Sequence, residues 1–137
     1  MRLRRAAAIG IGALIGGAVR WLAVTGLDVD PYLALLFVNT AACGLLGWVQ
    51  AQFRGGRRPD TDATDLLGIG LCGTLSTWSA LAVELSDDLR RGAVAAAIAW
   101  GALSVAAGIA AAIGGIALSG GSGGRSRRDG APRRAGP

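Results

Sequence analysis

The stretch LLGIGLCGTLSTWSALAVEL, residues 66–85, is apolar enough to cross a lipid bilayer but is interrupted at its centre by GTLSTWS, residues 73–79. An unpaired backbone amide or carbonyl is costly in hydrocarbon. A helix is therefore loosened at that depth only where the freed groups face protein, water or an ion. Discontinuous spans of this kind mark ion or substrate sites in many transport proteins. The alternative is a continuous helix whose small residues serve packing.

The rest of the chain favours a membrane protein, because 52% of its residues are hydrophobic and only 17% are charged. Four long apolar stretches occur, at residues 6–24, 32–53, 66–85 and 93–118. Each has the length that a transmembrane helix needs. We therefore expect an all-α integral membrane protein with four transmembrane helices, the third of them broken in mid-membrane, in one transmembrane domain over residues 1–118.

The ends of the spans carry helix boundary signals. Asp30 followed by Pro31 is typical of a capped helix start. We also expect caps for the third and fourth spans from the polar residues that precede their apolar cores, namely Asp62, Thr64 and Asp65 and then Ser86, Asp87 and Asp88. Residues 119–137 contain mainly Gly, Arg, Ser and Pro, a composition that predicts a disordered tail.

The distribution of charge predicts the orientation of the chain in the membrane. All 14 basic residues are arginine: three precede the first span, three lie between the second and third, and five lie in the tail. With four spans these eleven share one face, while only Arg90 and Arg91, with Arg20 at most, lie on the other. The positive-inside rule then places both termini in the cytoplasm. We expect a multi-pass protein of the plasma membrane. Membrane orientation explains the net charge of +5 without a nucleic-acid partner. The tail arginines are interpreted as solvated, with contact to anionic lipid as the alternative.

Enzymatic and metal-binding chemistry find little support in the sequence. The chain has no histidine, and its two cysteines, Cys43 and Cys72, lie inside apolar spans. They are interpreted as buried thiols, with a disulfide as the alternative. The hydroxyls in the third span have no histidine or lysine nearby to act as a base. We therefore do not expect an enzyme.

Three segments in register resemble one family, the Fluc/CrcB fluoride channels. Residues 70–79, GLCGTLSTWS, are similar to its G-x-C-G-G-x-T-T-F-S-T-F signature. Residues 36–40 with the glycines that follow resemble its L-x-V-N-x-x-G segment, and residues 12–21 resemble its G-A-x-x-R-Y start. The resemblance covers about residues 8–118. It implies small four-span subunits that pair antiparallel around two narrow pores, through which fluoride leaves the cell passively.

The resemblance also implies ion sites. A structural sodium ion, Na⁺, would be held at the dimer centre by the backbone carbonyls of Gly73 and Ser76. The fluoride pathway would include one amide, one indole and three hydroxyl side chains, namely Asn39, Trp78, Ser79, Thr77 and Ser104. Asn39 would be costly in an apolar span, so it either joins helices or serves the pore. A hydrogen bond to its own helix is the alternative for Ser104.

The chain departs from the family pattern in its third and fourth spans. Trp78 and Leu81 replace two pore phenylalanines, Ala80 replaces a threonine, and Gly108 replaces a second polar residue. One pore surface is therefore degraded. Together with the arginine bias, this favours pairing with an inverted homologous subunit, and an antiparallel homodimer is the alternative.

Arg20 would anchor its span at the interface by snorkelling, or attract anions in a vestibule.

Two other classes of membrane protein remain as alternatives. A small multidrug exporter would need a carboxylate in residues 6–24, where none occurs. A non-transporting assembly protein would use the Gly- and Ala-rich spans only for packing.

Overall fold

The computed structural model describes residues 2–26, 29–54 and 61–120, and these ranges contain helices but no strands. The helical elements are α1 (Arg2–Trp21), η1 (Leu22–Gly26), α2 (Pro31–Arg54), α3 (Thr61–Thr64), η2 (Asp65–Cys72), α4 (Gly73–Leu75), α5 (Trp78–Arg90) and α6 (Val94–Gly120). They form four spans long and apolar enough to cross a membrane: Arg2–Gly26, Pro31–Gln52, Asp62–Arg90 and Val94–Ser119. The predicted all-helical class and number of spans are confirmed. Of the predicted tail, Ser119 and Gly120 continue α6, and residues 121–137 lie outside the described ranges.

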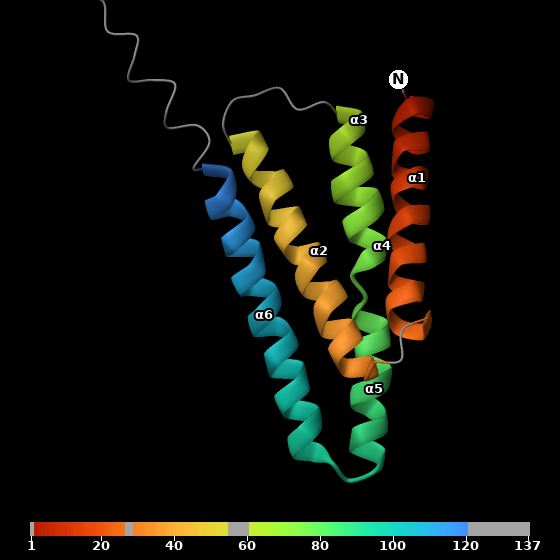
Figure 1. The fold of residues 1–137 in the computed structure, drawn as a ribbon, viewed down its shortest axis with the longest axis vertical. Helices are drawn as coiled ribbons and strands as arrows, with labels where there is room; N and C mark the ends of the chain where they lie inside the picture. Colours follow the sequence, from red (N-terminus) through yellow and green to blue (C-terminus); the bar gives the residue numbers. More distant parts are fainter. Residues whose placement is uncertain (1, 27–28, 55–60, 121–137) are drawn as a thin grey trace, which may run out of the picture.

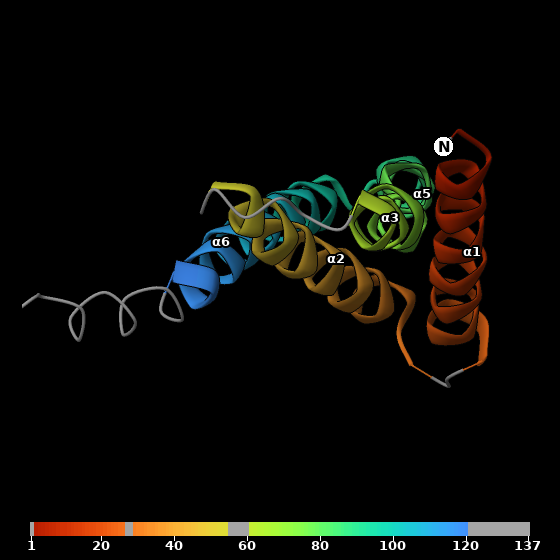
Figure 2. The ribbon, with the colours of Figure 1, turned by 90° about the horizontal axis from the view of Figure 1, so that it is seen from above.

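The four spans lie side by side in an open row at the end where α1 starts, whereas α5 packs against α6 at the opposite end (Figure 1). Seen from above, α1 is followed by the third span, then α2, then α6 (Figure 2). The most extensive packing joins α2 to α6 and α1 to η2. The described end of α6 lies at the same end of the bundle as the start of α1 (Figure 1). Because a row buries little of each helix, large apolar side chains such as Leu14, Phe37 and Ile98 stay exposed for lipid or a partner.

Glycines allow the two closest helix pairs to form. On α2 and α6, a Cβ at Gly47 would collide with the carbonyl oxygen of Ala112, and a Cβ at Gly115 with that of Gly44. On α1 and η2, the glycines at positions 12, 16 and 70 meet facing backbone in the same way. Small residues that let backbones approach closely are typical of membrane helix packing.

Local sequence explains where two of the spans begin and turn. The Asp30 carboxylate accepts hydrogen bonds from the amides of Tyr32 (2.9 Å) and Leu33 (3.3 Å), so it caps α2 as predicted. The link from α5 to α6 turns at Gly92, whose φ of 77° favours glycine.

The other predicted caps are wrong, because the third span is longer at both ends than its apolar core. Its first helical residue is Thr61, so Asp62, Thr64 and Asp65 lie inside the span. At its other end α5 continues to Arg90, and it thereby includes all three residues expected to cap the fourth span. Charged residues commonly mark helix limits, but here the acidic ones lie in the first and last turns of the span, where ion pairs stabilise them.

Candidate functional site

The third span changes its backbone geometry at Ser76 and Thr77. Helix α4 ends at Leu75, the next two residues are extended (φ −75°, ψ 142° and φ −145°, ψ 116°), and α5 begins at Trp78. Ser76 lies at the midpoint of the span Asp62–Arg90. Figure 1 shows this extended link about half-way along the bundle, between the ribbons labelled α4 and α5.

Asn39 on α2 satisfies both backbone groups of Thr77. The amide of Thr77 donates to Asn39 Oδ1 at 2.7 Å, and Asn39 Nδ2 donates to the Thr77 carbonyl at 3.3 Å. A primary amide has two donor hydrogens and a carbonyl oxygen, so this exchange leaves one hydrogen of Asn39 Nδ2 for another acceptor. Asn39 therefore joins two helices and keeps a donor that the exchange does not use.

The hydroxyl of Thr77 caps α5, the second half of the span. Thr77 Oγ1 accepts a hydrogen bond from the amide of Ala80 at 3.2 Å, which caps α5. The hydroxyls of Thr77 and Ser79 also lie 3.1 Å apart, within hydrogen-bonding distance. The buried Thr77 side chain thus has a structural role at the start of α5.

A groove of about 400 Å³ lies beside the extended link, between α2, α5 and α6. It is lined by Asn39, Cys43, Ser76, Thr77, Trp78, Leu81, Ser104, Val105, Gly108, Ile109 and Ala112. Four of the five residues predicted for the fluoride pathway are therefore in one place, and Ser79 is outside the lining. Ser104 makes no hydrogen bond to another described residue, which leaves its hydroxyl open to the groove.

Trp78 is the largest side chain of the groove and the least covered. It is 67% exposed, although its position directly follows the midpoint of the span. Leu81, one turn later on α5, is only 2% exposed and packs into the helix bundle. Of the two positions where the family resemblance implies phenylalanine, only Trp78 offers an aromatic edge or an N–H donor.

The backbone at Gly73 and Ser76 has properties that suit a hard cation. No amide of the described residues donates to either carbonyl oxygen. Ser76 N–H bonds to Cys72 and Thr77 N–H bonds to Asn39 instead of Gly73, and Ala80 N–H bonds to Thr77 Oγ1 instead of Ser76. A Cβ at Gly73 would meet nothing within 4 Å, so the space beside this residue is open. Hard cations prefer oxygen ligands, so the carbonyl donors fit Na⁺. The described residues contain no group of three or more His, Cys, Asp or Glu side chains that would bind another metal.

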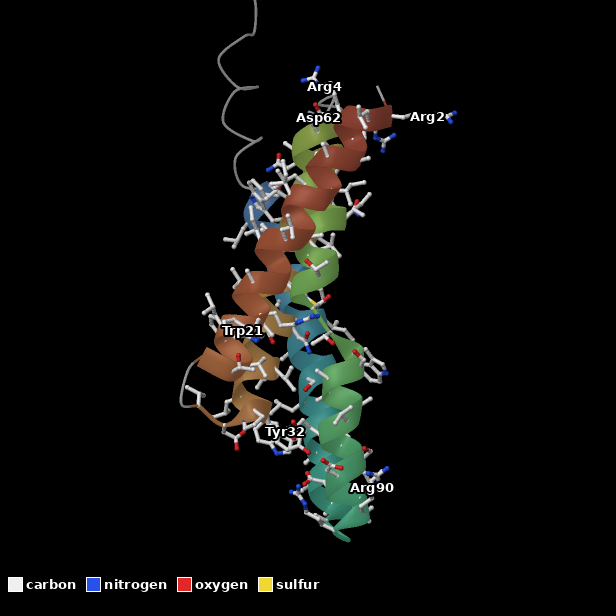
Figure 3. The ribbon with its side chains drawn as sticks, turned by 90° about the vertical axis from the view of Figure 1, so that its right-hand side faces the viewer. Arg2, Arg4, Trp21, Tyr32, Asp62 and Arg90 are labelled. Carbon is white, nitrogen blue, oxygen red and sulfur yellow. The ribbon has the colours of Figure 1, made fainter. Side chains whose placement is uncertain are left out.

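Arg20 lies away from this groove, in the last turn of α1. It is half-buried, and its neighbour Trp21 is exposed at the end of α1, where Figure 3 labels it. An arginine next to an exposed tryptophan is typical of a membrane interface. The structure thus keeps both predicted roles open, as an interfacial anchor and as a vestibule charge.

Two polar contacts far from the interruption were not predicted. Near the start of α1, the Arg5 guanidinium makes a bidentate contact with Asp65 on η2, at 2.6 and 3.2 Å, and Asp65 is 4% exposed. At the other end of the bundle, the Tyr32 hydroxyl donates to Asp88 Oδ2 at 2.6 Å. The labels of Figure 3 mark these ends by Arg2 with Asp62 and by Tyr32 with Arg90. The only sequence signal was the presence of each pair at the same predicted membrane face.

The thiols of Cys43 and Cys72 are both free, but only Cys72 is buried as predicted, because Cys43 is half-buried. Cys72 belongs to the core with Val38, Ala42 and Leu75, whereas Cys43 lines the groove. Since the two thiols differ in their surroundings, they offer separate probes of the core and of the groove.

Comparison with known proteins identifies the family. The family model described as "CrcB-like protein, Camphor Resistance (CrcB)" matches residues 7–116. The chain is 36% identical over 108 residues to "Fluoride-specific ion channel FluC 2" of Rhodococcus jostii, covering 76% of this chain and 89% of the relative. It is 34% identical over 123 residues to "Fluoride-specific ion channel FluC" of Stutzerimonas stutzeri, covering 85% and 98%. It is 38% identical over 112 residues to the FluC of Ruegeria pomeroyi, covering 81% and 86%. With its four helical spans and a match over most of its length, the chain belongs to the CrcB-like family.

Proposed function

We propose that this chain is one subunit of a passive fluoride channel of the plasma membrane. The observation that carries the proposal is the groove beside Ser76 and Thr77, where the Asn39 amide, the Trp78 indole and the Ser104 hydroxyl meet among apolar side chains. The family relatives named as fluoride-specific channels support fluoride as the ion.

The groove offers donors that replace the water lost by a small, strongly hydrated anion. One hydrogen of Asn39 Nδ2 remains after the exchange with Thr77, Ser104 keeps its hydroxyl, and Trp78 carries an indole N–H. Fixed polar groups of this kind select ions in narrow pores. Thr77 contributes by holding the start of α5 in place, and Ser79 contributes through its contact with Thr77.

The driving force needs no coupled ion or nucleotide. Hydrogen fluoride crosses lipid as a neutral weak acid, ionises in the cytoplasm and leaves the anion trapped there. An inside-negative potential favours exit of the anion by about 2.3 kcal/mol per 100 mV. An open anion path is therefore enough to lower cytoplasmic fluoride and its toxicity.

We infer that both termini face the cytoplasm. The arginines before the first span, between the second and third, and after the fourth all belong to one face, and they outnumber those on the other face by eleven to two or three. The common end of the bundle at which α1 starts and α6 ends supports this orientation (Figure 1). Arg20 would then lie toward the outer side, as anchor or vestibule charge.

An open row of four helices leaves the groove without a wall on one side. A second, inverted subunit would close it and would also bring a second extended link to the two-fold axis. Because the arginine bias fixes the orientation of this chain, we propose an inverted homologous subunit as the partner, and an antiparallel homodimer as the alternative. The lack of an aromatic ring at Leu81 and of a polar side chain at Ala80 and Gly108 supports one intact pore in such a pair.

Structural sodium would bind where the two extended links meet. The carbonyl oxygens of Gly73 and Ser76 would supply its ligands, since they receive no amide hydrogen from the described residues. The ion would fix the two broken spans to each other and would compensate carbonyl dipoles that face no water.

Fluoride efflux from liposomes tests these proposals. The purified chain, alone and with an inverted relative, is reconstituted in vesicles loaded with potassium fluoride, and external fluoride is measured after addition of valinomycin. We expect efflux from the pair and little from the lone chain. Absence of efflux from both would overturn the channel proposal, whereas strong efflux from the lone chain would overturn obligate pairing. Replacing all sodium by a bulky organic cation should reduce efflux, and unchanged efflux would exclude a required sodium ion.

A further inference from the structure

A polar and aromatic cluster lies between the groove and the α5–α6 turn, outside the residues that line the groove. Tyr32 stacks on Trp100 with ring centroids 5.0 Å apart and planes inclined by 8°. Its hydroxyl donates to Asp88 Oδ2 at 2.6 Å. The contact joins α2, α5 and α6, the same three helices that line the groove.

Helix periodicity places the stacked rings in line with the groove donors. Tyr32 precedes Asn39 by seven residues, or two turns, on one face of α2. Trp100 precedes Ser104 by four residues, or one turn, on one face of α6. An ion that passes Asn39 and Ser104 along these faces therefore meets the Tyr32–Trp100 stack next.

The carboxylate of Asp88 is aimed at Tyr32 rather than at its ion-pair partner. Its side chain is 14% exposed, and the nearest Arg91 nitrogen lies 3.9 Å away on a side chain that is 73% exposed. A short hydrogen bond to a carboxylate is among the strong ones. It holds the hydroxyl, and with it the ring, in the stacked position.

We propose that Tyr32 and Asp88 are positioning residues that set the narrowest part of the fluoride path and so its selectivity against larger anions. This inference rests on the proposed function and adds a selectivity element to it. With the hydrogen bond intact, the Tyr32 ring stays against Trp100 and admits only a small ion. Without it, the ring is free to tilt, the passage widens and chloride enters.

The test measures the ratio of chloride to fluoride efflux for the complete channel in liposomes. Y32F keeps the ring but removes the donor, and D88N keeps the shape of the acceptor but removes its charge. Y32F should raise the ratio about tenfold, the factor that corresponds to loss of one charge-assisted hydrogen bond. D88N should raise it by a smaller factor, since its amide oxygen still accepts from Tyr32 but without the charge. D87N is the matched control, since Asp87 carries the same charge on the neighbouring residue and its side chain pairs, among the described residues, with the exposed Arg90 at 3.6 Å.

A second readout does not depend on fluoride transport. In a C72A background, Cys43 in the groove reports access for a small methanethiosulfonate reagent added from outside. Y32F and D88N should speed its modification, and D87N should not. In a C43A background, Cys72, which is 2% exposed, should stay protected, which separates local widening from general loosening of the fold.

The outcomes distinguish the two proposals. If the parent channel carries no fluoride, the proposed function fails, while the rate of Cys43 modification still decides whether Tyr32 and Asp88 close the groove. If fluoride flows but Y32F and D88N keep the parent selectivity and Cys43 access, the inference on these two residues is wrong. Should Y32F fail to fold, D88N against D87N decides alone.

Discussion

Asn39 and Thr77 exchange two hydrogen bonds across the interface between α2 and the third span. The amide side chain thus pairs with the two backbone groups that an extended residue withdraws from its helix. In a bilayer no water is available to pair with these backbone groups, so the hydrogen bonds of this one asparagine stabilise the extended conformation. The same side chain retains a donor toward the groove, which links the stability of the extended link to the proposed ion path.

Replacing Asn39 by alanine should therefore damage both stability and transport. N39A leaves the Thr77 amide and carbonyl without partners, at about 1–3 kcal/mol for each group. We expect a clearly lower melting temperature in detergent and a loss of fluoride efflux of about tenfold or more. Thermal denaturation and liposome efflux measure the two effects.

The neighbouring residue provides the control for that substitution. Thr40 Oγ1 is buried and has no hydrogen-bond partner among the described residues. T40V removes this hydroxyl at nearly constant shape and should leave stability unchanged or raise it. If T40V and N39A were equally harmful, the exchange with Thr77 would not be the reason for the loss.

We predict opposite effects on stability when one methyl group is added at either of two adjacent glycines of α6. A Cβ at Gly115 would collide with the Gly44 carbonyl, whereas a Cβ at Gly114 meets nothing within 4 Å. G115A should cost about 1–3 kcal/mol of unfolding free energy through overpacking of α2 against α6. G114A should be neutral or stabilising by up to about 1 kcal/mol, because alanine favours helix. Equal melting temperatures for the two variants would contradict the close contact.

The helical class and the number of spans follow from the sequence because hydropathy over about 20 residues records them directly. The start of α2 is also local information, since Asp30 and Pro31 cap it within one turn. Within residues 73–79, where the sequence predicts an interruption, Ser76 and Thr77 are the extended ones. A threonine that caps a new helix is again a local signal.

Partners across the bundle could not be derived in this way. The sequence indicates that the polar side chain of Asn39 is unfavourable in an apolar span, but it does not reveal that its partner is the backbone of Thr77. The position of Asp65 before an apolar run predicts a helix cap. In the structure it instead pairs with Arg5, which lies 60 residues earlier in the chain. Such pairs depend on how helices are rotated and shifted relative to each other, which no single helix encodes.

The Arg5–Asp65 contact should matter more than its neighbour Arg4–Asp62. Asp65 is buried and held by two hydrogen bonds, whereas the Arg4–Asp62 distance is 3.5 Å, with Arg4 exposed and Asp62 half-buried. D65N should lower the melting temperature distinctly more than D62N, because exposed ion pairs contribute little. The double variant R5Q/D65N should recover part of the loss, since it removes both members of the pair. No recovery would mean that the two side chains are not coupled.

Trp78 offers the sharpest test of the groove as an ion path. If its indole contacts the anion, W78L removes both the N–H donor and the ring edge, and fluoride efflux should fall about tenfold or more. W78F keeps a ring edge and should retain an intermediate rate. The control is W21L, because Trp21 is similarly exposed (64% against 67%) but lies at the end of α1, outside the groove. Efflux of W78L at the parent rate would show that the indole of Trp78 faces lipid, and the path would then depend on Asn39 and Ser104 alone.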